Sequence, residues 1–134
     1  MFWKNAAVWD ALQTGADVLF QDVDIVWRAD PRPVLASGGS EDMAFMYDGP
    51  NRYQQPLYVN SGFFFVRNTK QSRALWHEAY ISGHAQSAQQ PFLERLLVHH
   101  YFNNGLTLRV LDDRFVNGHL LDTPDHSPPA YWLV

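Results

Sequence analysis

Two aspartates, Asp22 and Asp24, are the residues of this sequence best suited to chemistry. They follow directly after an apolar run, Val18-Leu19-Phe20, which is typical of a buried strand. If the extended conformation persists, side chains alternate between two sides, so the two carboxylates point the same way. Two carboxylates held together need a cation, and oxygen ligands suit Mg²⁺ or Mn²⁺, which are often shared with substrate phosphates. The pattern therefore predicts a site for a divalent metal and a phosphate group.

The same triplet also has a purely structural interpretation. Aspartates are common in turns, where their side chains accept hydrogen bonds from backbone amides. The position directly after an apolar strand favours a functional role, because an acid beside a buried strand loses hydration, and this costs free energy unless a partner compensates for it. Both interpretations stay open on these residues alone.

A second unusual stretch, Asn60-Ser61-Gly62, lies inside a predicted strand over residues 58–67. Amide and hydroxyl groups inside a buried strand need hydrogen-bond partners. A glycine there indicates a bulge or the close approach of a ligand. A kinked strand whose asparagine caps a neighbouring loop explains the same residues.

The composition indicates one globular domain. The chain has 134 residues, 46% of them hydrophobic and 15% aromatic, with a net charge of -4, which is enough for one core and too little for two. The ten lysines and arginines are scattered, which argues against nucleic-acid binding. The sequence has no cysteine for a disulfide or thiolate site, and no apolar run of about 18 residues to span a membrane.

Helical and strand patterns alternate along much of the chain. Hydrophobic spacing and capping residues predict helices over residues 2–14, 70–82 and 88–103, the last two capped by Thr69 and Ser87. Strands are predicted over residues 17–21, 43–47, 58–67, 106–111 and 115–121. The prolines of residues 30–33 predict an extended or turned backbone. The alternation indicates an α/β fold with a mostly parallel or mixed sheet.

Two blocks, taken together, resemble a known family. They are ADVLFQDVDIVWRADP at residues 16–31 and YVNSGFFFVRNT at residues 58–69, followed by a helix with a Gln-Gln-Pro start. They are similar to the nucleotide-diphospho-sugar transferase family, which includes plant and algal arabinosyl- and xylosyltransferases. The resemblance implies a GT-A, Rossmann-like mixed sheet flanked by helices, in a single domain over residues 1–134. We expect part of a longer catalytic domain, with the family's uracil-binding strand before Met1 and its metal-binding histidine after Val134.

The resemblance also implies a function. We expect a glycosyltransferase that moves a sugar from a nucleotide-sugar donor, a UDP-sugar by resemblance, to a glycan or glycoprotein acceptor, with Mn²⁺ or Mg²⁺. Asp24 would bind the metal directly, and Asp22 would reach the ribose or the metal through water. Asn60, Ser61 and Gly62 would form part of the substrate site. Eukaryotic relatives work in the Golgi lumen.

The family places an Asp-Gln pair beside the donor sugar, with the Gln near the anomeric carbon. The matching residues are Gln89 and Gln90, which are therefore the catalytic candidates, and the similar enzymes are retaining. An amide stands where the family has an acid at Gln89. This departure motivates one alternative, a catalytically inactive sugar-nucleotide-binding fold.

A second alternative is a Mg²⁺-dependent phosphatase of the haloacid dehalogenase type. Its opening motif is also an apolar strand followed by two spaced acids, with Asp22 as nucleophile and Asp24 as general acid. Such an enzyme needs a later lysine near the phosphate, and the only lysines are Lys4 and Lys70. The asparagine block at residue 60 is also left unexplained by this alternative.

Other polar residues give weaker signals. The six histidines lack metal-binding spacing: His77, His84, His99, His100, His119 and His126. The pair Asp112-Asp113 lies after a predicted strand, where a turn salt-bridged by Arg114 is favoured over a role near the acceptor.

Overall fold

The computed structural model describes residues 2–48, 57, 59–83, 89–112, 114 and 115. Their helices are α1 (Phe2–Gln13), α2 (Arg32–Ala36), α3 (Lys70–Ser82) and α4 (Gln89–Asn104). Their strands are β1 (Val18–Gln21), β2 (Met43–Tyr47), β3 (Val59–Val66) and β4 (Leu108–Val110). None of these helices has the length and apolar character that crossing a bilayer requires.

The four strands form one mixed sheet in the order β1-β3-β2-β4. Strand β3 runs antiparallel to both β1 and β2, whereas β2 and β4 are parallel. The predicted α/β class with a mixed sheet is confirmed. Of the two predicted arrangements, mostly parallel or mixed, the described strands form the mixed one, because β3 lies beside β2 and reverses direction without an intervening helix.

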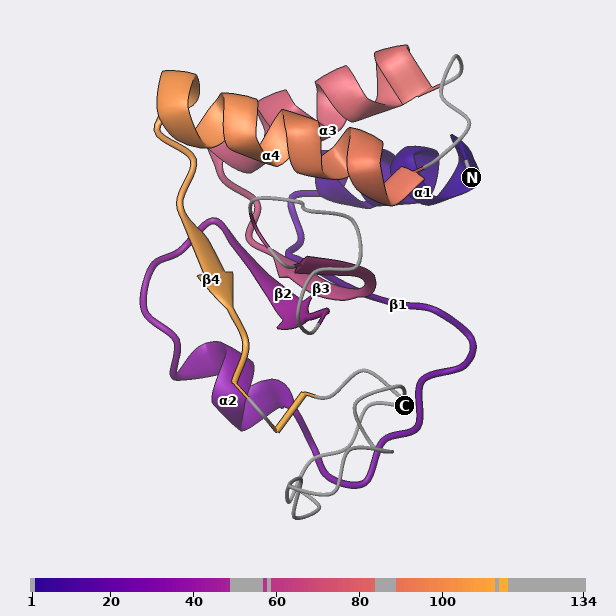
Figure 1. The fold of residues 1–134 in the computed structure, drawn as a ribbon, viewed down its shortest axis with the longest axis vertical. Coiled ribbons are helices and arrows are strands. Elements are labelled where there is room, and N and C mark those ends of the chain that lie inside the picture. Colours follow the sequence, from indigo (N-terminus) through magenta and orange to yellow (C-terminus); the bar gives the residue numbers. More distant parts are fainter. Residues whose placement is uncertain (1, 49–56, 58, 84–88, 113, 116–134) are drawn as a thin grey trace.

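Helices cover both faces of this sheet (Figure 1). Helices α1, α3 and α4 lie together on one face, and the short helix α2 lies on the other. Side chains alternate along β2 accordingly: Phe45 points into the larger core, while Ala44 and Met46 point toward α2. On β3, the neighbours Phe63 and Phe64 divide between the same two cores. The central strands are therefore buried on both faces.

The predicted element ends agree closely with the structure. Thr69 caps α3 in a capping box with Ser72, in which each side chain accepts a hydrogen bond from the other residue's backbone N–H. Helix α1 ends before Gly15, whose φ of 85° favours glycine. Ser87, the predicted cap of α4, lies outside the described residues.

Two predicted segments differ from the structure. Residues 32–36 form helix α2 instead of an extended or turned segment, since Pro31 is its N-cap and Pro33 lies where a missing N–H costs nothing. Phe115 lies in a bend, so the predicted strand over residues 115–121 is wrong at its start. The rest of that segment lies outside the described residues.

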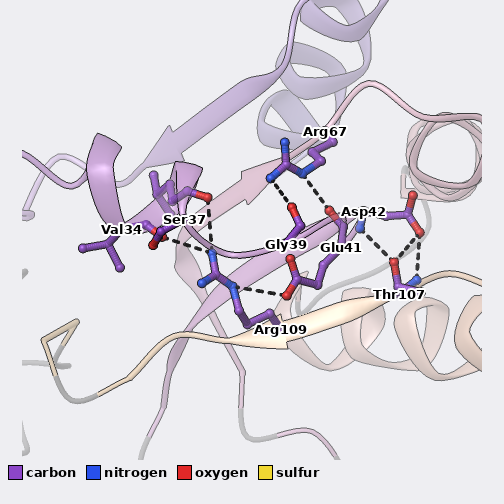
Figure 2. Close-up of polar contacts among 9 residues, drawn as sticks. Val34, Ser37, Gly39, Glu41, Asp42, Arg67, Thr107 and Arg109 are labelled. Atoms are coloured by element: carbon purple, nitrogen blue, oxygen red, sulfur yellow. Dashed lines mark hydrogen bonds and ion pairs between the residues drawn. The ribbon is translucent and has the colours of Figure 1, made fainter.

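Asp42, just before β2, connects three elements through hydrogen bonds. Its carboxylate accepts from the backbone N–H and hydroxyl of Thr107, at 2.8 and 2.9 Å (Figure 2). It also accepts from the Thr69 hydroxyl at 2.6 Å. The Asp42 N–H in turn donates to the Thr107 carbonyl. Because Asp42 is buried, these bonds replace the water that its carboxylate would otherwise need.

We predict that Asp42→Ala lowers the free energy of unfolding by about 2–4 kcal/mol, because three donors lose a charged acceptor. Urea denaturation measures this. Asp30→Ala is the matched control, because its carboxylate pairs only across an exposed loop with Arg32. Equal losses in the two variants would contradict the role assigned to Asp42.

Candidate functional site

The acidic triplet lies in a turn at the end of β1. The N–H of Ile25 contacts the Asp22 carbonyl at 3.4 Å, so the chain reverses at residues 23 and 24. Val23 and Asp24 are exposed. The prediction that an extended chain aligns Asp22 with Asp24 is therefore wrong. The physical reason is that the β1–β3 ladder ends at Gln21, and the Asp22 N–H makes one further backbone bond to Gly62 before the chain turns.

Asp22 is held by a lysine from helix α1. The Lys4 ammonium lies 2.9 Å from Asp22 Oδ1 and donates to the Ser61 carbonyl at 2.9 Å. It also lies 4.6 Å from the centroid of the Phe20 ring. The Lys4 side chain is only 14% exposed, so the charge of Asp22 is balanced by a largely buried cation. Sequence reasoning missed this role, although Lys4 is one helical turn from the buried Val8.

Strand β3 bulges at the residues that looked unusual in the sequence. Phe45 of β2 pairs with Phe64, but the next residue, Met46, pairs with Asn60. The bulge predicted from Gly62 is confirmed. The Gly62 N–H donates to Asn60 Oδ1 at 2.6 Å, and the Gly62 carbonyl accepts from the Asp22 N–H at 2.7 Å.

Asp48 and Gln90 connect the bulge to helix α4. Asp48 follows β2 and accepts from Asn60 Nδ2 at 2.6 Å and from Gln90 Nε2 at 2.9 Å. Gln90 Oε1 accepts from both the N–H and the hydroxyl of Ser61, each at 3.3 Å. The amide of Gln90 is thereby fixed in orientation at both of its ends.

These contacts close into one cycle, which we call the polar ring. It consists of Lys4, Asp22, Gly62, Asn60, Asp48, Gln90 and Ser61. Five of the seven are predicted site residues, which the structure brings together from β3, α4 and the end of β1. Sequence reasoning missed Lys4 and Asp48. Asp48 could have been found as an acid that directly follows a strand, as Asp22 does.

Two predicted site residues are not members of the ring. Asp24 lies in the turn after β1 with an exposed side chain. Gln89 is the first residue of α4, and its side chain lies outside the described part of the structure. Their predicted roles as metal ligand and catalytic residue stay predictions.

Glu94 is a buried acid one helical turn after Gln90. It is 3% exposed. Burial, with a smaller contribution from the negative charge of Asp48, raises the pKa of Glu94 from 4.5 to about 7. Sequence reasoning did not select it, because a glutamate inside an amphipathic helix is ordinarily solvent-exposed.

The weaker candidates have structural explanations. Arg114 pairs with Asp112 through two hydrogen bonds across a turn, and these bonds lower the pKa of Asp112, as the structural interpretation predicted. His100 is buried and lies 3.0 Å from Glu78, while His99 is exposed. Within the described ranges, no three His, Asp or Glu side chains come together as a metal cluster.

A shallow cavity of about 530 Å³ lies beside β1. It is lined by Leu19 and by residues 27–32, including the Trp27 ring. The Trp27 indole N–H donates to Gln21 Oε1, at the end of β1. The cavity therefore lies between Leu19 of β1 and the segment that follows the turn.

Comparison with known proteins identifies the family. The model of the nucleotide-diphospho-sugar transferase family matches residues 1–129. The chain belongs to the nucleotide-diphospho-sugar transferase family. The expected resemblance is thus confirmed, and the described α/β sheet with its flanking helices fits part of a transferase domain of this family. The match favours a transferase over the phosphatase alternative.

Two relatives come from Arabidopsis thaliana. The chain is 30% identical over 118 residues to the beta-arabinofuranosyltransferase RAY1, covering 84% of this chain and 21% of that protein. It is 29% identical over 129 residues to the uncharacterised protein At1g28695, covering 92% of this chain and 38% of that protein. The chain thus spans well under half the length of either relative. No solved structure matches it significantly.

Gly62→Ala should break the ring. The added Cβ would lie 2.8 Å from Asn60 Oδ1 and 3.1 Å from Asp22 Oδ2, so we expect a loss of about 1–3 kcal/mol in the free energy of unfolding. Chemical denaturation measures it. In an Asn60→Ala background the same substitution should cost less, because the nearer clashing atom is gone. An unchanged stability of Gly62→Ala would refute the close approach.

Glu94→Gln should stabilise the protein at pH 8 and change little at pH 4. Below pH 4.5 the carboxyl group is neutral in both the folded and the unfolded state; between 4.5 and about 7 only the unfolded state ionises. The free energy of unfolding of the wild type therefore falls as the pH rises through this window, by up to about 3 kcal/mol. Thermal melts of both proteins across this range measure the difference. Glu41→Gln is the control, because this glutamate pairs with an arginine, Arg109, and not with a histidine. A similar pH dependence of its effect on stability would contradict the assignment.

Proposed function

We propose that the polar ring is the donor side of a glycosyltransferase active site that binds a nucleotide sugar, with UDP as the nucleotide. The observation that carries the proposal is the ring itself: one hydrogen-bonded cycle joins the acid after β1 to the amide at the start of α4. These are the residues to which the family resemblance assigned donor contacts. Two acids of the cycle, Asp22 and Asp48, directly follow strands β1 and β2. The carboxyl ends of strands in an α/β sheet favour ligand binding.

The ring prepares polar groups for a sugar nucleotide. Asp48 and Ser61 hold the Gln90 amide from opposite ends, so its remaining hydrogen-bonding capacity points in one fixed direction. Asn60 is fixed in the same way by Asp48 and the Gly62 N–H. Groups with fixed orientation can bind sugar hydroxyls without a further loss of side-chain entropy.

The donor set also fits a divalent metal shared with the substrate. Asp24 offers an exposed carboxylate at the turn, and Asp22 lies two residues before it, partly neutralised by Lys4. Mg²⁺ and Mn²⁺ are commonly bound by one or two carboxylates, with phosphate oxygens completing the shell. Such an ion supplies Lewis-acid stabilisation of the diphosphate leaving group. The Lys4 ammonium supplies a further positive charge beside Asp22.

The acceptor and the stereochemistry belong to the same proposal. A glycan or glycoprotein acceptor and a retaining transfer follow from the family resemblance. The similarity to a beta-arabinofuranosyltransferase makes an activated arabinofuranose the first donor to test. An assay of sugar transfer distinguishes the proposed enzyme from an inactive fold that only binds sugar nucleotides.

A thermal melt with UDP, with and without Mn²⁺, tests the donor site. At about a hundred times its dissociation constant the ligand should add roughly 2.7 kcal/mol, seen as a higher melting temperature. The shift should require both UDP and Mn²⁺, and Asp24→Asn should abolish it by removing the exposed carboxylate. Asp10→Asn, at an exposed acid of α1 outside the ring and the cavity, should keep it. A cooperative melt that UDP and Mn²⁺ leave unchanged would refute donor binding by this chain.

A further inference from the structure

Lys4 is the cation of the polar ring, and three contacts fix its position. Its ammonium lies 2.9 Å from Asp22 Oδ1 and donates to the Ser61 carbonyl at 2.9 Å. It also lies over the Phe20 ring, 4.6 Å from the ring centroid. An ammonium has three N–H donors, so two of them are used within the protein, and the Phe20 ring covers a further side of the group.

The carboxylate of Asp22 is held in one orientation by its neighbours. Oδ1 faces the Lys4 ammonium. Oδ2 lies 3.1 Å from the position that a Cβ on Gly62 would take, so this oxygen packs against the bare backbone of the glycine. The Asp22 N–H donates to the Gly62 carbonyl at 2.7 Å, which fixes the backbone as well. Asp22 thus has a permanent partner for its charge and little freedom to turn toward another one.

The charge of the acid pair determines how strongly it attracts a cation. Asp22 and Asp24 carry two negative charges, and the ammonium of Lys4 reduces their sum to one. The affinity of a carboxylate site for a divalent cation depends on the number of charged ligands that the site supplies. A nucleoside diphosphate supplies both negative charge and phosphate oxygens, which compensate for the charge that Lys4 balances.

We propose that Lys4 is a positioning residue, the built-in counter-ion of Asp22, so that the ligand-free site binds a divalent cation weakly and takes it up together with the diphosphate of a nucleotide. This inference rests on the proposed function, which makes the triplet a metal and donor site. The ammonium acts through Asp22 and does not reach for phosphate itself. Its side chain is only 14% exposed, and turning outward would break its contacts with both Asp22 and Ser61.

Mn²⁺ binding to the ligand-free chain, followed by the electron paramagnetic resonance signal of free Mn²⁺, tests this role. Lys4→Gln keeps an amide donor beside Asp22 and removes the charge. Lys70→Gln is the matched control, because it removes the same charge at the exposed start of α3. We expect Lys4→Gln to bind Mn²⁺ about tenfold more tightly than the wild type, and Lys70→Gln to match the wild type.

The direction of this change separates the proposed role from a structural one, since damage to the site would weaken Mn²⁺ binding. Equal affinities of Lys4→Gln and the wild type, or the same tightening in Lys70→Gln, overturn the proposal. If Lys4→Gln does not fold, the wild type decides by itself. Mn²⁺ alone should then bind at least about tenfold more weakly than Mn²⁺ with UDP, and equal binding of the two overturns the proposal.

Titration calorimetry of the wild type with UDP and Mn²⁺ together separates this inference from the proposed function. Binding of the pair supports the donor site on which the inference rests. Absence of binding refutes that donor site, and the comparison of Lys4→Gln with the wild type in Mn²⁺ alone then still decides whether Lys4 weakens metal binding.

Discussion

The absence of a side chain at Gly62 is the constraint on which the candidate site depends. At this residue the central strand β3 bulges, and both Asn60 and Asp22 approach within the space that a Cβ would occupy. Without that approach, the Gly62 backbone could not join the end of β1 to Asn60. At Phe63 and Phe64, strand β3 packs into the apolar cores on both faces of the sheet. At the bulge just before them, the same strand makes polar contacts instead.

Three acids meet near this bulge, and each is accommodated by different physical chemistry. Asp22 has a cation, since Lys4 lies 2.9 Å away. Asp48 has hydrogen bonds from two amide side chains. Glu94 keeps its proton up to about pH 7 because of burial. The energetic cost of collecting acids in this part of the fold is therefore offset separately for each of them.

Strand β2 connects the site to the rest of the fold. It begins after Asp42, which anchors β4 and α3, and it ends before Asp48, which holds Gln90. Asp22 follows β1 and Asp48 follows β2, and both strands run antiparallel to β3, which lies between them. The carboxyl ends of strands in an α/β sheet are where ligands bind. Because β3 runs the other way, its first residues reach the same edge. Topology thereby gathers residues that are far apart in the sequence.

The sequence by itself determined the α/β class, the family, and the elements that carry the site. Hydrophobic periodicity and caps such as Thr69 are local signals, so α3 and β2 were predicted with nearly their observed ends. Gly62 indicated its bulge for the same local reason. Tertiary structure decided the direction of β3, the turn that separates Asp22 from Asp24, and the contacts of Lys4, Asp48 and Glu94. These depend on which distant residues pack together, and no periodicity within one segment encodes that.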